Sequence, residues 1–115
     1  MGKDEDVLRS EIPPGTLYML ILKSLARLGP MHGYGIAAYI QQTSEDVLQV
    51  EEGSLYPALQ RMLLKGWLAA EWGQSENNRR ARYYSLTPEG RKQLTKEISE
   101  FERVVHAITR VIQPA

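Results

Sequence analysis

The sequence lacks the residues on which several kinds of protein depend. Its 115 residues contain no cysteine, which excludes disulfides and thiolate metal sites and favours a reducing cytoplasm. No apolar run approaches the ~18–20 residues that cross a bilayer, because the apolar stretch 17–22 ends at Lys23. We therefore predict a cytoplasmic location and no membrane segment.

Side chains typical of catalytic and cofactor sites are also scarce. His32 has no second histidine or carboxylate at metal-ligand spacing, so we expect it to cap a helix or make a hydrogen bond. Gly33 and Gly35 complete neither of the common phosphate-loop patterns. No serine lies in a nucleophile elbow, and the glutamates at 51–52 fit a solvated turn better than an acid–base pair. We predict no enzyme activity, no cofactor and no metal.

Charge is distributed unevenly along a chain of one domain's length. With 43% apolar and 24% charged residues and a formal net charge of zero, the chain is globular but not basic overall. Residues 54–82 hold five basic and two acidic side chains, a net of +3, whereas residues 1–53 hold four basic and eight acidic ones, a net of −4. Positive potential is therefore confined to one region.

That region begins with a predicted amphipathic helix between Gly53 and Gly66. We expect Ser54 to cap it and Gly66 to end it, with Pro57 in the first turn, where its missing N–H has no partner. Apolar residues spaced i, i+4, i+7 and i+8 form its inner stripe: Leu55, Leu59, Met62 and Leu63. The expected outer side is small, polar and basic: Ser54, Ala58, Arg61 and Lys65. This outer side suits the major groove of DNA, although the solvent-exposed face of a core helix would show the same pattern of residues.

Two further helices are predicted before this one. After a polar tail over residues 1–12, Thr16 caps a buried helix that stops at Gly29-Pro30, and a second helix covers about 33–43. A very short strand at 48–50 precedes the basic helix. Two helices with a short connection, the second amphipathic and basic outside, describe a helix-turn-helix.

After Gly66 the apolar period changes to two, which predicts a β-hairpin. Residues 73–78 supply the turn, and the return strand carries Arg79, Arg80 and Arg82 among tyrosines. A hairpin of this kind beside a basic helix can grip phosphates as a wing. The alternative is an edge strand protected from aggregation by its charges.

The last helix is predicted over 88–112, with Thr87 as its cap and Pro88 at its first position. Apolar residues at steps of four and three form a heptad-like seam: Leu94, Ile98, Phe101, Val105, Ile108 and Ile112. At ~1.5 Å per residue the helix is roughly 37 Å long, longer than so small a domain can cover. We expect a second copy of the chain to cover the seam, giving a homodimer.

Taken together, these segments resemble the PadR family of bacterial transcriptional regulators over about residues 14–112. The resemblance is carried by the following runs: Gly15-Thr16-Leu17, His32-Gly33-Tyr34, Gly53-Ser54-Leu55-Tyr56-Pro57-Ala58-Leu59, Gly66-Trp67-Leu68, Arg82-Tyr83-Tyr84 and Leu86-Thr87-Pro88-Glu89-Gly90. It implies a mostly α fold with a small β-hairpin (α+β): a winged helix-turn-helix at 13–87 and a dimerisation helix at 88–113. The family's recognition helix falls on 54–65 and its wing on about 72–83.

The resulting hypothesis is a homodimeric transcriptional repressor that binds a two-fold operator in double-stranded DNA. The expected DNA-binding residues lie on the second helix, the basic helix and the wing: Tyr34, Ser54, Tyr56, Gln60, Arg61, Lys65, Arg79, Arg80 and Arg82. Ser54, Tyr56, Gln60 and Arg61 are assigned to base edges or the adjacent backbone, and the remaining basic residues to phosphates. The alternative is a winged-helix adaptor that binds protein instead of DNA. Some regulatory signal is expected, but the sequence identifies no pocket and leaves open whether there is a small-molecule effector.

Overall fold

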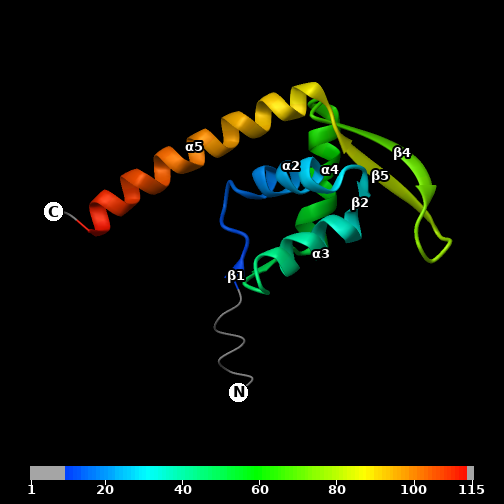
Figure 1. Cartoon of the computed structure of the whole chain (residues 1–115), viewed down its shortest axis with the longest axis horizontal. Coiled ribbons are helices and arrows are strands. Elements are labelled where there is room, and N and C mark those ends of the chain that lie inside the picture. The colour runs from blue at the N-terminus through cyan, green and yellow to red at the C-terminus, as the bar shows by residue number, and fades with distance from the viewer. Residues whose placement is uncertain (1–9, 114–115) are drawn as a thin grey trace, which may run out of the picture.

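The computed structural model describes residues 10–113, which form an α+β fold with a small antiparallel sheet at one side of the helices (Figure 1). The helices are α2 (Leu17–Leu28), α3 (Gly33–Thr43), α4 (Glu52–Leu64) and α5 (Pro88–Ile112). The strands are β1 (Ser10–Glu11), β2 (Met31–His32), β3 (Leu48–Gln49), β4 (Leu68–Gln74) and β5 (Arg80–Leu86).

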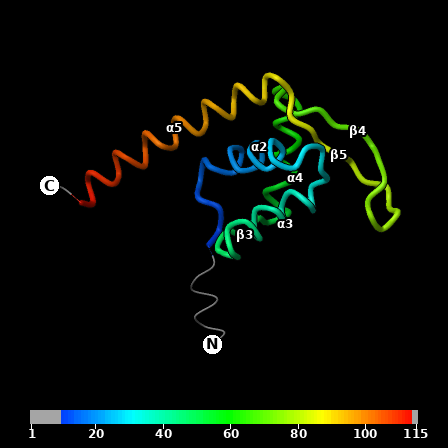
Figure 2. The backbone as a smooth tube through the Cα atoms, in the orientation of Figure 1, coloured from blue at the N-terminus to red at the C-terminus, as the bar shows by residue number. Residues whose placement is uncertain are grey.

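Helix α2 lies at the centre of the core, in contact with α3, α4, α5 and β5 (Figure 2). Ile21, Leu22 and Leu25 are buried on it, one helical turn apart or less. Thr16 occupies the N-cap position, but its hydroxyl donates to the Pro13 carbonyl at 2.7 Å instead of capping the helix. The helix ends as expected at Gly29, whose φ of 79° is in the left-handed region that favours glycine.

The sheet has three strands in the order β2-β5-β4, one more than the predicted hairpin. The additional strand, β2, is only two residues long and pairs Met31 with Tyr84 and His32 with Tyr83. A segment this short carries no alternating pattern, so it could not be recognised in the sequence. The strand ties the start of α3 directly to the base of the wing.

The expected polar tail is only partly described. Residues 1–9 of it lie outside the described residues, and its last part, Ser10–Glu11, forms the strand β1. This strand pairs in parallel with β3, and the Ser10 N–H donates to the Val47 carbonyl at 2.6 Å. The predicted strand near 48–50 is thereby confirmed, with a partner that the sequence did not indicate.

Helix α5 begins and ends as predicted and continues beyond the body of the molecule (Figure 1). Thr87 caps it by accepting a hydrogen bond from the Gly90 N–H at 3.0 Å, and Pro88 occupies its first turn. Leu94 is buried and Ile98 packs against the core, whereas every residue from Phe101 to Ile112 is exposed. The chain itself therefore covers only the first two of the six seam residues, Leu94 and Ile98.

Candidate nucleic-acid interface

Helix α4, the expected recognition helix, starts two residues earlier than predicted. Its N-cap is Glu51, and the Ser54 and Leu55 N–H groups donate to the Glu51 carbonyl, so the expectation that Ser54 caps the helix is wrong. Pro57 consequently lies in the second turn instead of the first. Because proline has no N–H, the Gly53 carbonyl receives no helical hydrogen bond from it.

The inner face of α4 is wider than the predicted stripe. Leu55, Leu59 and Met62 are buried as expected, and Leu63 is partly buried. Ala58 is completely buried as well, so its assignment to the outer side is wrong. Its small side chain is needed where α4 lies close to the rest of the core, and a sequence pattern cannot separate that role from a small residue facing solvent.

The outer face of α4 has a centre and two flanks. At about 100° per residue, the positions opposite the buried stripe are Gly53, Pro57, Gln60 and Leu64, all exposed. Leu64 is 78% exposed, and the sequence analysis did not select it. Ser54, Arg61 and Lys65 lie on one flank of this face, and Tyr56 lies on the other.

A groove of about 950 Å³, here called the wing groove, separates the wing from the start of α3 and from Tyr56 of α4. It brings together five of the predicted DNA-binding residues: Tyr34, Tyr56, Arg79, Arg80 and Arg82. Three arginines and a single carboxylate, Glu76, line it, so its lining is positively charged. Helix residues and wing residues that are far apart in the sequence thus share one surface.

Strand pairing explains why Arg80 and Arg82 of the wing face this groove. In the hairpin, Leu68 is opposite Leu86, Ala70 opposite Tyr84, Trp72 opposite Arg82 and Gln74 opposite Arg80, so all of these share one face. The base of that face packs on the helical core through Leu68 and Tyr84, which are buried. The same alternation directs the basic side chains nearer the tip toward α3 and α4.

Tyr56 joins the recognition helix to the start of α3. An added Cβ at Gly33 would lie 2.8 Å from the Tyr56 ring, so only glycine permits this close approach. Burial raises the pKa of the Tyr56 phenol, and the nearby Glu52 carboxylate and Tyr84 raise it further. The phenol therefore remains a hydrogen-bond donor at neutral pH.

His32 fulfils the capping role that was predicted for it. Its Nδ1 accepts a hydrogen bond from the Gly35 N–H at 3.0 Å, at the N-terminus of α3. The ring also stacks on Tyr34 and meets Tyr83 edge-on. Within residues 10–113, no group of histidine, cysteine or carboxylate side chains is arranged to hold a metal ion.

Two predicted basic residues lie away from the wing groove. The Arg61 Nε donates to the Tyr18 hydroxyl of α2 at 2.6 Å, with the guanidinium 5.7 Å from the Tyr18 ring. The Lys65 ammonium lies 5.2 Å from the Trp67 ring. Both cations thus flank α4 on the side of α2, an arrangement that depends on tertiary contacts and has no signal in the sequence.

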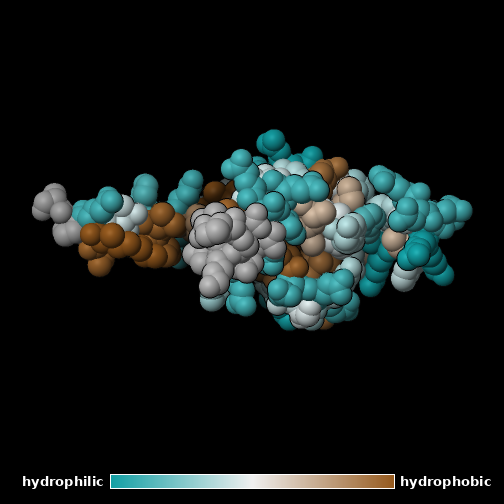
Figure 3. Space-filling view, turned by 90° about the horizontal axis from the view of Figure 1, so that it is seen from below, coloured by the Kyte–Doolittle hydropathy of each residue, from teal (hydrophilic) through white to brown (hydrophobic). Residues whose placement is uncertain are grey.

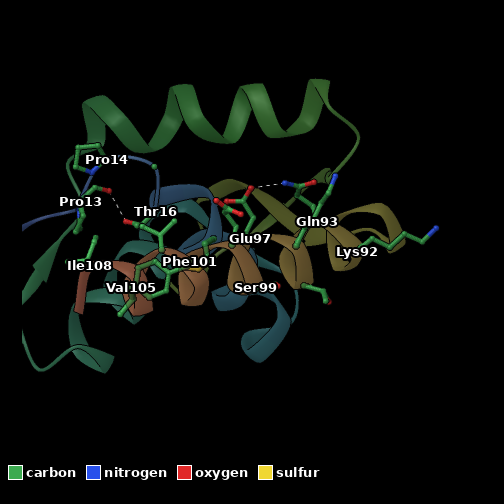
Figure 4. A pocket seen from close by; sticks show the side chains of 16 residues that line it. Pro13, Pro14, Thr16, Lys92, Gln93, Glu97, Ser99, Phe101, Val105 and Ile108 are labelled. Carbon is green, nitrogen blue, oxygen red and sulfur yellow. Dashed lines mark hydrogen bonds between the residues drawn. The ribbon is translucent and has the colours of Figure 1, made fainter. Parts of the chain in front are cut away.

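A second groove, here called the helix groove, lies between α5 and the segment that leads into α2 (Figure 4). It measures about 980 Å³ and is lined on its apolar side by Pro13, Pro14, Met19, Phe101, Val105 and Ile108. Figure 3 shows that apolar surface continues from the body along one side of the projecting helix. Phe101, Val105 and Ile108 of the predicted dimerisation seam therefore border a cavity as well as solvent.

A helix-turn-helix followed by a hairpin wing, with an arginine-lined groove between them, defines a winged-helix DNA-binding protein. The sequence profile described as "Transcriptional regulator PadR-like family" matches residues 21–96. The chain belongs to this family, whose members are transcriptional regulators and not enzymes. No helix formed by residues 10–113 has the length and apolar character required to cross a membrane.

Two solved structures agree with this assignment, and one sequence relative matches most of the chain. A transcriptional regulator from Clostridium thermocellum has a TM-score of 0.79 and 27% identity, covering 86% of this chain and 95% of that chain. A PadR family transcription regulator from Clostridium difficile has a TM-score of 0.72 and 28% identity, covering 85% and 99%. An uncharacterised protein of Lysinibacillus sphaericus is 28% identical over 102 residues, which are 89% of this chain and 93% of that protein.

Proposed function

We propose that the chain acts as a homodimeric repressor that binds a two-fold operator in double-stranded DNA. The observation that carries this proposal is the wing groove, in which tyrosines of α3 and α4 face three wing arginines across one positively charged surface. Arginine side chains and phenol hydroxyls are common donors to phosphate oxygens. A sugar-phosphate strand that follows this groove would bring the outer face of α4 to the major groove.

The contacts to DNA divide according to position. Gln60 stands at the centre of the outer face of α4, where its amide can bond the N6 and N7 atoms of adenine. Ser54 and Tyr56 lie on either side of it, near the start of the helix. Arg61 and Lys65, held against Tyr18 and Trp67, contact the backbone beside the groove. Arg79, Arg80 and Arg82 bind phosphates from the wing.

The proposed dimer forms through α5. Val111 and Ile112 are 80% and 70% exposed, and Phe101, Val105 and Ile108 are exposed on the same helix. A continuous apolar surface of this kind marks an interaction site. A helix from a second copy would lie in the helix groove and along the seam and would cover this apolar surface. The dimer would then place its two recognition helices at half-sites about 34 Å apart. Repression then follows from occlusion of a promoter, and the protein acts in the cytoplasm, where the DNA is.

Equilibrium binding to the DNA upstream of the protein's own gene, across a salt series, tests the DNA proposal. We expect specific binding that weakens steeply with salt, because each phosphate contact releases counterions and contributes about 0.9 to the logarithmic slope. Arg79→Ala/Arg80→Ala should reduce the slope by about 2. No binding even at low salt would reject the proposal and favour the adaptor alternative, in which the same variant keeps its protein partner.

Sedimentation of two α5 variants tests the dimer. Ile108→Glu places a charge in the proposed seam and should produce a monomer, because an unpaired carboxylate cannot be buried there. His106→Glu, at an exposed position on the opposite side of the helix, is the matched control and should remain dimeric. A monomeric wild-type protein, or equal behaviour of the two variants, would contradict the seam.

A further inference from the structure

Trp72 of β4 is a large aromatic residue that takes no part in the core. It shares one face of the wing with Leu68 and Ala70, which pack in or against the core, yet Trp72 itself is 59% exposed. It lines the wing groove, and the sequence analysis assigned it no function. Exposed tryptophan surface costs free energy in water, so the position requires an explanation.

Trp72 lies beneath a wing arginine. The Arg80 Cζ is 4.6 Å from the centroid of the Trp72 ring, within the range of a cation–π contact. Arg82, directly opposite Trp72 in the strand register, lies instead over Tyr84 at 5.9 Å. Arg79, in the turn, has no aromatic ring stacked on it among residues 10–113.

Among residues 10–113 the Arg80 guanidinium has one partner, the Trp72 ring. Both salt bridges found there are on α5, so no carboxylate holds this guanidinium. An arginine near the tip of a wing has considerable rotamer freedom, which is lost when it binds a ligand. Stacking uses the face of the guanidinium and leaves the N–H groups at its edge free to donate.

We propose that Trp72 is a positioning residue that holds Arg80 in the wing groove, ready to bind a DNA phosphate. This inference depends on the proposed DNA-binding function, because the phosphate is the ligand that the positioned guanidinium receives. Trp72 acts through Arg80, so its contribution to DNA affinity is present only while Arg80 is present.

A double-mutant cycle on DNA affinity tests this dependence. Trp72→Ala should weaken binding about two- to five-fold, the loss expected for an exposed cation–π contact. In a chain that already carries Arg80→Ala, Trp72→Ala should have no further effect. The matched control is Arg79→Ala. In a chain that carries Arg79→Ala, Trp72→Ala should weaken DNA binding by the same factor as in the wild type.

Two further variants separate the aromatic face from mere bulk. Trp72→Phe keeps a π face and should restore most of the affinity, whereas Trp72→Leu keeps an apolar side chain and should bind as weakly as Trp72→Ala. Thermal melts of all variants should agree closely with that of the wild type, because Trp72 is exposed. A role confined to stability would not distinguish Phe from Leu in DNA affinity.

The possible failures are distinguishable. If the wild type binds DNA and Trp72→Ala weakens binding equally with and without Arg80, the positioning role is overturned and the proposed function is not affected. If Trp72→Ala or Arg80→Ala binds DNA as tightly as the wild type, the positioning role is also overturned and the proposed function is not affected. If the wild type shows no salt-dependent DNA binding, both proposals are overturned.

Discussion

Replacement of Gly90 by alanine should destabilise the protein, whereas the same replacement at Gly53 should stabilise it. Both glycines lie in the first turn of a helix, α5 and α4 respectively. An added Cβ at Gly90 would collide with the Trp67 carbonyl oxygen and lie 2.8 Å from Leu86 Cδ1. At Gly53 it would have no atom within 4 Å. The two variants therefore compare the same added methyl group at a position without space for it, Gly90, and at a position open to solvent, Gly53.

The magnitudes follow from two opposing effects. Overpacking costs about 1–3 kcal/mol, and the higher helix propensity of alanine returns about 0.5–1 kcal/mol. Because the clash at Gly90 is with a backbone oxygen, which cannot rotate away, the upper part of the overpacking range applies, and Gly90→Ala should lose about 1–2 kcal/mol of the free energy of unfolding. Gly53→Ala should gain about 0.5–1 kcal/mol. In a domain of this size each kcal/mol moves the melting temperature by roughly 4 °C.

Thermal unfolding by circular dichroism measures both variants. The protein concentration must be the same in every sample, because a dimer melts at a temperature that depends on it. Gly90→Ala should melt roughly 4–8 °C below the wild type and Gly53→Ala a few degrees above it. A Gly90→Ala protein that melts at or above the wild-type temperature would refute the contact between the start of α5 and the Trp67 carbonyl.

Two more predictions concern α5. Thr87→Ala removes the hydroxyl that accepts a hydrogen bond from the Gly90 N–H and lies 2.7 Å from the Gly66 carbonyl oxygen. Chemical denaturation should show that the free energy of unfolding falls by about 0.5–2 kcal/mol. An unchanged denaturation midpoint would contradict the cap. The Glu100 carboxylate accepts two hydrogen bonds from Arg103, which lower its pKa, and the Arg103 charge lowers it further. The pKa of Glu100 is therefore lower in the folded protein than in the unfolded chain. Stabilisation by the Glu100–Arg103 pair is present above the unfolded-chain pKa of Glu100 and disappears as the pH falls through its pKa in the folded protein. NMR titration should find Glu100 below the ordinary glutamate range and, in Arg103→Gln, back within it; identical titrations would exclude the pair.

Local signals in the sequence predicted most of the elements. The limits of α5 followed from Thr87, Pro88 and the heptad spacing, and the end of α2 followed from Gly29. The predicted turn at 73–78 is only partly correct, since Gly73 and Gln74 belong to β4 and β5 begins at Arg80, but it does contain the left-handed Asn78, with a φ of 60°. These features depend on residues close together in the chain, where capping and backbone preferences act.

The errors at Ala58 and β2 concern interactions between distant segments, whereas the capping errors at Thr16 and Ser54 are local, because the Thr16 hydroxyl donates to Pro13 and the Ser54 N–H donates to Glu51. Ala58 is buried because α4 approaches its neighbours closely, and Pro57 occupies a second turn because α4 begins at Glu52. Met31 and His32 form a strand only because β5 is available beside them. A periodic pattern describes one face of one element and does not indicate what that face will meet.

The proposed site was named from the sequence as a set of residues, whose role in DNA binding stays a prediction, but their arrangement could not be derived from the sequence. Tyr34, Tyr56 and the wing arginines meet in one groove, as a winged helix-turn-helix requires. Arg61, which was assigned to base edges or the adjacent backbone, lies outside that groove and donates to the Tyr18 hydroxyl of α2. Trp72 and Leu64 were missed because an apolar residue in an apolar pattern is assigned to the core unless its exposure is known.

Site-directed cleavage of DNA tests the central claim most directly. The chain contains no cysteine, so one introduced cysteine carries a DNA-cleaving reagent to a single position. Asn77→Cys places it at the tip of the wing, and Glu102→Cys, on the exposed part of α5, is the control. With the reagent at Asn77, we expect cleavage at two positions related by two-fold symmetry in a bound upstream fragment, and none with the reagent at Glu102. Cleavage from Glu102 without cleavage from Asn77 would contradict the central claim.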